Sequence, residues 1–216
     1  MQTENLTRRF IWINPVVEAM ADSLYPSIIQ QITDRGFSVV SCNTGLEKVR
    51  QAYRQYLQRD VNKPVIDTRC PKVACMVNCH FPQLQDSQSE VLPILMVCAQ
   101  DLYELHVRTN PDKASLTIVT PCSSLADVGN SKLGHIARFI TWIDFCTEQE
   151  FFIALPRAVS SPIPPGYFRF PEYRVLEASG PDAVKGLLNR ISQNSNEADL
   201  VELLYCNGGC HNGDGV

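Results

Sequence analysis

The sequence predicts an α/β fold with largely parallel sheets. Short runs of β-branched and aromatic residues alternate along the chain with longer stretches that have the apolar spacing of helices. Strands that alternate with helices of this length are typical of βαβ units, in which the strands run parallel. The hydrophobic fraction of 44% in 216 residues is enough for a buried core, in one large domain or two small lobes.

The first half of the chain shows this alternation from residue 8 onward. Gly36 ends the first helix, which Pro26 is expected to kink or split. Thr44 is a capping candidate, and Pro71 and Pro93 stand where helices begin, a position that tolerates proline. We expect strands at 8–15, 37–43 and 63–68, and helices at 16–36, 44–60, 71–81 and 89–109.

The second half continues the pattern around one Pro-rich stretch at 160–172, which we interpret as a loop or a connection between lobes. Before it we expect a strand at 115–120, a helical turn at 123–129, a strand or amphipathic segment at 137–145 and a helix at 146–155. After it we expect a strand at 174–179, a helix at 180–194 and a last strand at 199–205.

Charge and hydropathy narrow the classes of function. The net charge is −4 and the 19 basic residues are scattered, so we expect no nucleic-acid partner, which would need a clustered basic face. No apolar run approaches the roughly 18 residues of a membrane span. The first residues lack the apolar core of a signal peptide, and an odd count of nine cysteines argues against a disulfide framework. We therefore expect a cytoplasmic protein.

Four cysteines share one context. Cys70, Cys122 and the pair Cys206 and Cys210 each follow an expected strand, in KPVIDT, SLTIVT and DLVELLY respectively. In a parallel sheet these positions are carboxyl ends on one edge, where α/β proteins build their sites. Four thiolates from three loops can bind zinc or an iron–sulfur cluster. One close pair plus two isolated cysteines favours the cluster over zinc.

The residues around these cysteines fit a ligand loop. Gly208 and Gly209 let the backbone bend, and their N–H groups can point at sulfur and tune a cluster's potential. Pro121 stiffens the loop before Cys122, as Pro71 does after Cys70. The remaining five cysteines are interpreted as core residues, with Cys75 and Cys79 on one buried helix face: Cys42, Cys75, Cys79, Cys98 and Cys146.

Three motifs together resemble the catalytic domain of FeFe hydrogenases. The family's T-S-C-C-P-G-W, followed by Y-P-E-L, compares with DTRCPKV and the later FPQL. Its M-P-C-x-x-K compares with TPCSSL, and its E-x-M-A-C-x-G-G-C-x-x-G-G-G with ELLYCNGGCHNGDG. The order matches, and the resemblance runs from about Lys63 to the end. The third motif is the most specific.

The resemblance implies two Rossmann-like lobes with the metal site at strand carboxyl ends between them. We expect one hydrogenase-like domain over 1–216, with lobes at about 1–110 and 111–216. By position, the ligands of a 4Fe-4S cluster are Cys70, Cys122, Cys206 and Cys210, and Cys210 is the residue that bridges to a diiron subsite in the family.

Departures from the family pattern fall on the residues that serve the diiron subsite. The proton-relay cysteine corresponds to Arg69, which stays protonated and is a poor proton shuttle. The lysine that meets a cyanide corresponds to Leu125, the two methionines to Thr120 and Leu204, and the tryptophan to Val73. We therefore expect the 4Fe-4S cluster without the diiron subsite.

The favoured hypothesis is a hydrogenase-like iron–sulfur protein for electron transfer or for redox or gas sensing, without H2 chemistry. Its partner is then a protein electron donor or acceptor, or a signalling protein. One alternative is a divergent active hydrogenase, with Glu202, His211 or Arg69 as catalytic candidates. Others are a structural zinc protein and a cluster-free domain whose thiols are core residues. Arg69 is also a candidate for charge compensation beside an anionic cluster, against a surface salt bridge.

Overall fold

The computed structural model describes residues 7–59, 61–151, 153, 155, 160–194 and 197–216. The chain forms two compact units, each assembled from segments that are separate in the sequence. Unit 1 comprises Met1–Gly45, Leu95–Ala158 and Asp214–Val216, and unit 2 comprises Leu46–Ile94 and Val159–Gly213. Among the described residues, no helix is both long and apolar enough to cross a membrane.

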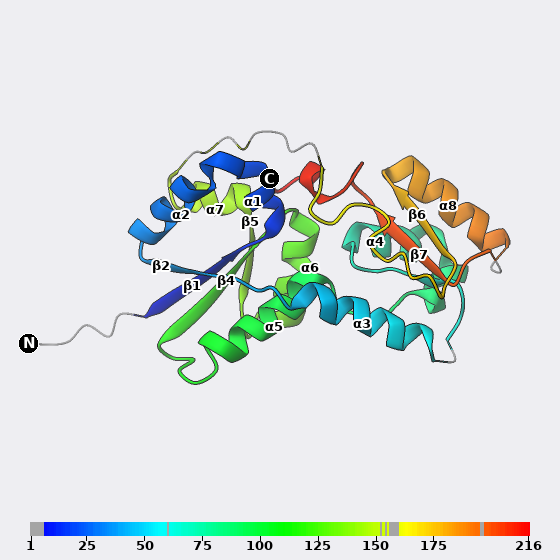
Figure 1. Ribbon diagram of the computed structural model, residues 1–216, viewed down its shortest axis with the longest axis horizontal. Coiled ribbons are helices and arrows are strands. Elements are labelled where there is room, and N and C mark those ends of the chain that lie inside the picture. Colours follow the sequence, from blue (N-terminus) through cyan, green and yellow to red (C-terminus); the bar gives the residue numbers. More distant parts are fainter. Residues whose placement is uncertain (1–6, 60, 152, 154, 156–159, 195–196) are drawn as a thin grey trace, which may run out of the picture. The chain divides into compact units, whose positions relative to one another are not determined.

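Unit 1 is built on a parallel four-stranded sheet with the order β2-β1-β4-β5 (Figure 1). Its strands are β1 (Arg8–Ile13), β2 (Phe37–Val40), β4 (Ala114–Thr120) and β5 (Arg138–Thr141). β1 pairs with β4 over six residues, so that Arg8 lies opposite Ala114 and Ile13 opposite Val119. The buried pattern of β4 and β1 at their carboxyl ends shows that helices cover both faces there.

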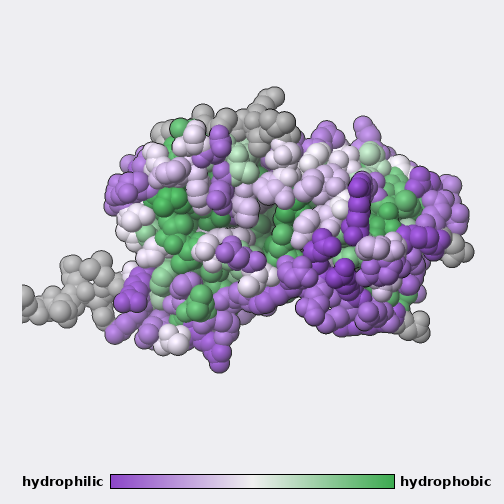
Figure 2. Space-filling model, viewed as in Figure 1, coloured by the Kyte–Doolittle hydropathy of each residue, from purple (hydrophilic) through white to green (hydrophobic). Residues whose placement is uncertain are grey.

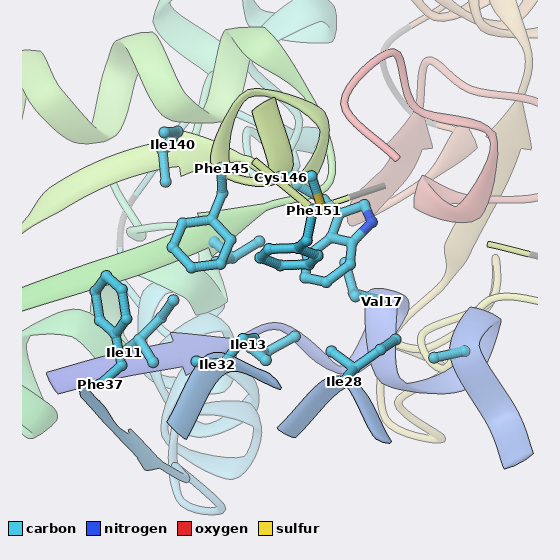
Figure 3. Close-up of a cluster of buried hydrophobic side chains, with 13 residues drawn as sticks. Ile11, Ile13, Val17, Ile28, Ile32, Phe37, Ile140, Phe145, Cys146 and Phe151 are labelled. Atoms are coloured by element: carbon cyan, nitrogen blue, oxygen red, sulfur yellow. The ribbon is translucent and has the colours of Figure 1, made fainter. Parts of the chain in front are cut away.

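One face of this sheet carries the main core of unit 1. The helices α1 (Pro15–Ala21), α2 (Tyr25–Asp34) and α7 (Trp142–Glu148) pack there. Figure 3 shows Phe145 and Phe151 lying above Ile11 and Ile13 of β1. Asn14 connects the two layers, because its side-chain oxygen caps α1 and its amide donates to the Val119 carbonyl at 2.9 Å.

The opposite face of the sheet is covered by α5 (Ile94–His106) and α6 (Ser123–Leu133). Phe10 of β1 stacks on His106 of α5 with ring centroids 4.9 Å apart. Gly129 of α6 lies so close to the Phe139 ring that a Cβ at this position would come nearer to the ring than real Cβ atoms do. Glycine at 129 therefore permits the close approach of α6 to β5.

Unit 2 is built on a parallel three-stranded sheet with the order β3-β7-β6. Its strands are β3 (Val65–Ile66), β6 (Val175–Ser179) and β7 (Leu200–Leu204). α4 (Pro71–His80), the short 3-10 helix η2 (Pro82–Ser87) and α8 (Pro181–Gln193) pack on one face through an apolar cluster that includes Ile66, Val201 and Leu203. Alternation along β7 sends Glu202 to the other face, toward Tyr53 of α3 (Gly45–Leu57). Figure 2 shows hydrophilic residues over the outer side of α3.

The predicted α/β class with parallel sheets is confirmed, but three predicted elements were wrong in detail. The helix at 16–36 splits at Asp22, whose φ of 46° ends α1, and Pro26 lies in the first turn of α2. The helical turn at 123–129 continues to Leu133 as α6. The helix expected at 146–155 begins earlier, at Trp142, because Thr141 caps it, and ends at Glu148. Part of that expected segment lies outside the described residues.

Candidate functional site

Three of the four predicted ligand cysteines lie at one edge of the unit 2 sheet. Cys70 follows β3 by four residues and is the N-cap of α4, with Pro71 as the first helical residue. Cys206 follows β7 by two residues, and Cys210 opens the 3-10 helix η4 (Cys210–Asn212). β3 and β7 are parallel neighbours, with Ile66 opposite Val201, so their carboxyl ends share an edge.

Cys122 corrects the idea of a single common edge. It follows β4, which belongs to the four-stranded sheet of unit 1, so only three of the four cysteines follow strands of one sheet. Cys122 is 7% exposed and is the N-cap of α6. The Asp214 carboxylate caps the same helix, accepting from Ser123 N–H at 3.0 Å and Ser123 Oγ at 2.9 Å. The Gly215 N–H donates to the Pro121 carbonyl at 3.1 Å.

The loop between Cys206 and Cys210 depends on its two glycines. Gly208 and Gly209 have φ of 70° and 128°, a region that favours glycine. A Cβ on Gly209 would lie 2.6 Å from Ser161 Cβ, so a side chain cannot fit there. The Gly208 N–H donates to Ser179 Oγ and the Gly209 N–H to the Cys206 carbonyl, each at 3.2 Å. These two bonds hold the loop to itself and to β6.

His211 folds back over its own loop. Asn212 Nδ2 lies 3.0 Å from His211 Nε2, and a Cβ on Gly208 would lie 3.5 Å from the ring. The Nδ1 atom of His211 is buried and has no hydrogen-bond partner among the described residues. His211, one of the catalytic candidates, is half-buried.

Arg69 is the centre of a buried ion network in unit 2. Its guanidinium donates to Asp67 Oδ2 and to Glu202 Oε1, each at 2.8 Å. Tyr53 donates its hydroxyl proton to Asp67 Oδ1 at 2.6 Å. The Arg69 guanidinium carbon also lies 4.1 Å from the centroid of the Phe168 ring. Arg69 is 7%, Asp67 0% and Glu202 1% exposed, so water screens none of these charges.

Burial and neighbouring charges shift the pKa values of three groups in the network, Arg69, Tyr53 and Glu202. Burial lowers the pKa of Arg69, but Asp67 and Glu202 outweigh burial, so that the pKa of the guanidinium is raised and it stays charged. Burial and then the Asp67 carboxylate raise the pKa of Tyr53 well above 10. Burial also raises the pKa of Glu202, and the donors Arg69 and Phe168 N–H oppose that shift. All groups that contact Glu202 in the network are donors, so they favour its carboxylate form.

The hydrogen bonds of Glu202 and Arg69, two of the catalytic candidates, indicate a structural role. Glu202 accepts from Arg69, from Tyr167 N–H at 3.2 Å and from Phe168 N–H at 3.0 Å. It therefore ties the segment at 167–168 and the Arg69 turn to β7. The Arg69 charge is paired with two carboxylates. The alternative of a surface salt bridge was wrong, because the ion pairs are buried. Sequence reasoning missed the partners Asp67 and Tyr53.

The other cysteines differ from the single core role predicted for them. Cys98 and Cys146 are buried, as expected. Cys75 and Cys79 are exposed on α4 with their sulfur atoms 3.9 Å apart, so a buried helix face was wrong for them. Cys42 is half-buried. The nine cysteines form no disulfide within the part of the chain that the structure describes.

A single-ion site is not preformed in the described part of the chain. There, no three side chains of His, Cys, Asp or Glu lie close enough together to hold one metal ion. The donor set at the unit 2 edge is nevertheless made of thiols on loops, which suits iron–sulfur chemistry. In such a cluster each thiolate binds a different iron atom, so its ligands stand farther apart than the ligands of one ion.

Comparison with known proteins shows the fold. No family model matches the chain, and no curated protein matches it. A variant of apo FeFe-hydrogenase HydA1 from Chlamydomonas reinhardtii is similar in structure, with a TM-score of 0.67 and 14% identity over 99% of this chain and 80% of that one. A second HydA1 variant from the same organism has a TM-score of 0.68 and 12% identity, over 99% and 81% of the two chains.

The structure of HydA(deltaEFG), which concerns stepwise assembly of the FeFe-hydrogenase H-cluster, is similar to the same degree. Its TM-score is 0.67 at 13% identity, over 99% of this chain and 81% of that one. The fold of this chain is therefore the FeFe-hydrogenase fold. At these identities the likeness shows the fold alone, and the chemistry must be argued from the residues.

Proposed function

We propose that this chain is a hydrogenase-like iron–sulfur protein that binds one 4Fe-4S cluster through Cys70, Cys122, Cys206 and Cys210. The observation that carries the proposal is the placement of Cys70, Cys206 and Cys210 on loops at one carboxyl edge of a parallel sheet, in the FeFe-hydrogenase fold. Ligand sites of open α/β sheets are built at this edge.

Two of the proposed ligands stand at helix N-termini. Cys70 precedes the 10-residue α4 and Cys122 the 11-residue α6, and neither side chain makes a capping hydrogen bond. A helix N-terminus carries a partial positive charge, which is a favourable environment for an anionic cluster with thiolate ligands. When bound, the cluster supplies one-electron redox chemistry.

Cys122 is the one proposed ligand that belongs to unit 1. Its loop is held by other residues of that unit, because the Asp214 carboxylate accepts from Ser123, the neighbour of Cys122, and the Gly215 N–H donates to the Pro121 carbonyl.

The proposed role is electron transfer or redox sensing with a protein partner, without H2 chemistry. Arg69 occupies the position of the family's relay cysteine, and its guanidinium is held by two buried carboxylates. Leu125 is buried where the family has its lysine, and an apolar side chain cannot donate to a diiron ligand. The Thr120 hydroxyl donates to the Cys122 carbonyl at 3.0 Å, so it stiffens this turn.

Anaerobic reconstitution with iron and sulfide tests the proposal. We expect a broad absorbance near about 400 nm in the native chain, as thiolate-bound clusters show. Cys206→Ser and Cys122→Ser should each lose most of it. Cys75→Ser is the matched control, because this exposed thiol lies outside the proposed ligand set and should leave the spectrum unchanged. A colourless, iron-free native protein would refute the proposal, and hydrogen evolution after diiron maturation would revive the hydrogenase alternative.

A further inference from the structure

Two cysteines outside the proposed ligand set form a pair in unit 1. Cys42 lies in the loop between β2 and α3, three residues before Gly45 opens the helix. Its sulfur is 3.8 Å from Thr44 Oγ1 and accepts hydrogen bonds from the N–H groups of Thr44 and Gly45. The thiol of Cys98 on α5 also bonds this sulfur. Cys42 is half-buried, whereas Cys98 is only 2% exposed.

A second contact fixes the same loop on the same face of α5. The Thr44 hydroxyl donates to Asp101 Oδ2 at 2.9 Å. Asp101 and Cys98 are three residues apart, so they lie on one side of the helix. The loop is thus held at two points, by Asp101 to Thr44 and by Cys98 to Cys42. The Thr44–Asp101 bond keeps the loop that carries Cys42 beside the turn of α5 that carries Cys98.

We propose that Cys42 and Cys98 form a reversible disulfide, in which Cys42 is the attacking thiolate and Cys98 the resolving thiol. The oxidant is a small disulfide such as oxidised glutathione. Cys42 attacks one sulfur of this molecule, forming a mixed disulfide and releasing one small thiolate. Cys98 then gives up its proton, attacks Cys42 Sγ and displaces the second small thiolate. In total, two protein thiols are oxidised and one small disulfide is reduced to two small thiols.

The environment assigns the two roles. The hydrogen bond from Cys98, and then the backbone N–H groups of Gly45 and Thr44, lower the pKa of Cys42 to about 5 against an opposing effect of burial. The hydrogen bond to Cys42 and burial raise the pKa of Cys98. Once Cys42 is in a mixed disulfide its negative charge is gone, and with it one cause of the raised pKa of Cys98. The resolving step therefore becomes easier after the first.

Cys42 and Cys98 lie close to the two points at which the chain leaves unit 1 and returns to it. The chain leaves unit 1 after Gly45 and returns to it at Leu95. Cys42 stands three residues before the first crossing and Cys98 three residues after the second. A disulfide between them would link the chain just before segment 46–94 to the chain just after it. The exposed pair Cys75 and Cys79 on α4 has neither a buried member nor such a position.

Peptide mapping tests the proposal on anaerobically purified native protein. The protein is treated with equimolar oxidised glutathione, its remaining thiols are alkylated, and the digest is analysed by mass spectrometry. We expect a peptide pair that links Cys42 to Cys98 and disappears on reduction. Cys98→Ala should leave glutathione on Cys42, and Cys42→Ser should leave Cys98 as an unmodified thiol. Linkage of Cys75 to Cys79 without any Cys42 linkage would overturn the proposal.

A second measurement does not depend on the folding of any variant. The rate at which a small alkylating reagent modifies Cys42 is followed against pH in the native protein, with the Cys75 and Cys79 peptides as an internal comparison. The titratable group that bonds Cys42 is Cys98, and the next nearest on α5 is Asp101, which acts on Cys98 and bonds Thr44. We expect the Cys42 rate to rise with a midpoint near pH 5. A midpoint near the ordinary cysteine value of about 8.5 would contradict the assigned role.

Discussion

Removal of Arg69 should strongly destabilise the fold. An Arg69→Leu change leaves Asp67 and Glu202, which are 0% and 1% exposed, without their shared cation. Breaking a buried ion pair by removing one partner costs about 3–5 kcal/mol. Donors from Tyr53, Tyr167 and Phe168 remain on the two carboxylates, so we expect the lower end, about 3 kcal/mol. This is a large part of the roughly 5–15 kcal/mol that stabilises a typical domain.

Urea unfolding followed by far-ultraviolet circular dichroism measures this cost. Arg190→Leu is the matched control in the same unit, because Arg190 pairs with Glu197 at 2.7 Å but both side chains are partly exposed, at 55% and 30%. An exposed pair of this kind contributes up to about 1 kcal/mol. If Arg69→Leu costs no more than Arg190→Leu, the argument for the buried network is refuted.

The loss of stability in Arg69→Leu should depend on pH. Burial raises the pKa of Glu202 and Arg69 is the main group that opposes this shift, so without Arg69 the folded-state pKa of Glu202 rises further above its unfolded value. When an acid has a higher pKa in the folded than in the unfolded state, the folded protein loses stability as pH rises through that range. We therefore expect the difference between native protein and Arg69→Leu to be smaller near about pH 5 than near about pH 8. A difference independent of pH would contradict this.

Three further changes probe the packing that positions the cysteine loops, each measured by urea unfolding. Gly129→Ala should cost about 1–3 kcal/mol because its Cβ meets the Phe139 ring, whereas Gly186→Ala, with open space around it, should stabilise α8 by up to about 1 kcal/mol. Equal effects at both glycines would contradict the packing argument. Asp214→Ala should cost about 0.5–2 kcal/mol by removing the α6 cap, and Asp214→Asn should restore part of it. Trp142→Ala should cost about 3–5 kcal/mol, because Trp142 is 2% exposed in the unit 1 core.

Much of the fold could be predicted from the sequence because local signals agree with the tertiary structure. Pro71 begins α4 and Gly36 follows α2 where their backbone preferences place them. The boundary near Trp142 was mispredicted because an apolar run of this length is ambiguous between strand and helix. There the Thr141 cap, which accepts from Asp144 N–H at 3.1 Å, decides for a helix. The division into two discontinuous units arises from long-range packing, which leaves no local signal.

The candidate site could be predicted in part. The strand context of Cys70 and Cys206 followed from their sequence neighbours. The exposure of Cys75 and Cys79 on α4 did not, because helical spacing says which residues share a face and not which face is covered. A charged Glu202 inside the apolar strand LVELL was a signal for a buried partner, since carboxylates are rarely buried unpaired. It could not identify Arg69, which is 133 residues away in sequence. The contact of Cys42 with Cys98 likewise depends on tertiary packing.

The most direct test of the proposed four-cysteine cluster is the iron, sulfide and zinc content of the protein purified without oxygen. We predict about four iron and four sulfide per native chain. Both contents should be lower in Cys206→Ser and unchanged in Cys75→Ser. About two further irons per chain would indicate a diiron subsite and an active hydrogenase. Zinc at about one per chain, or no metal in the native protein, would contradict the proposed function.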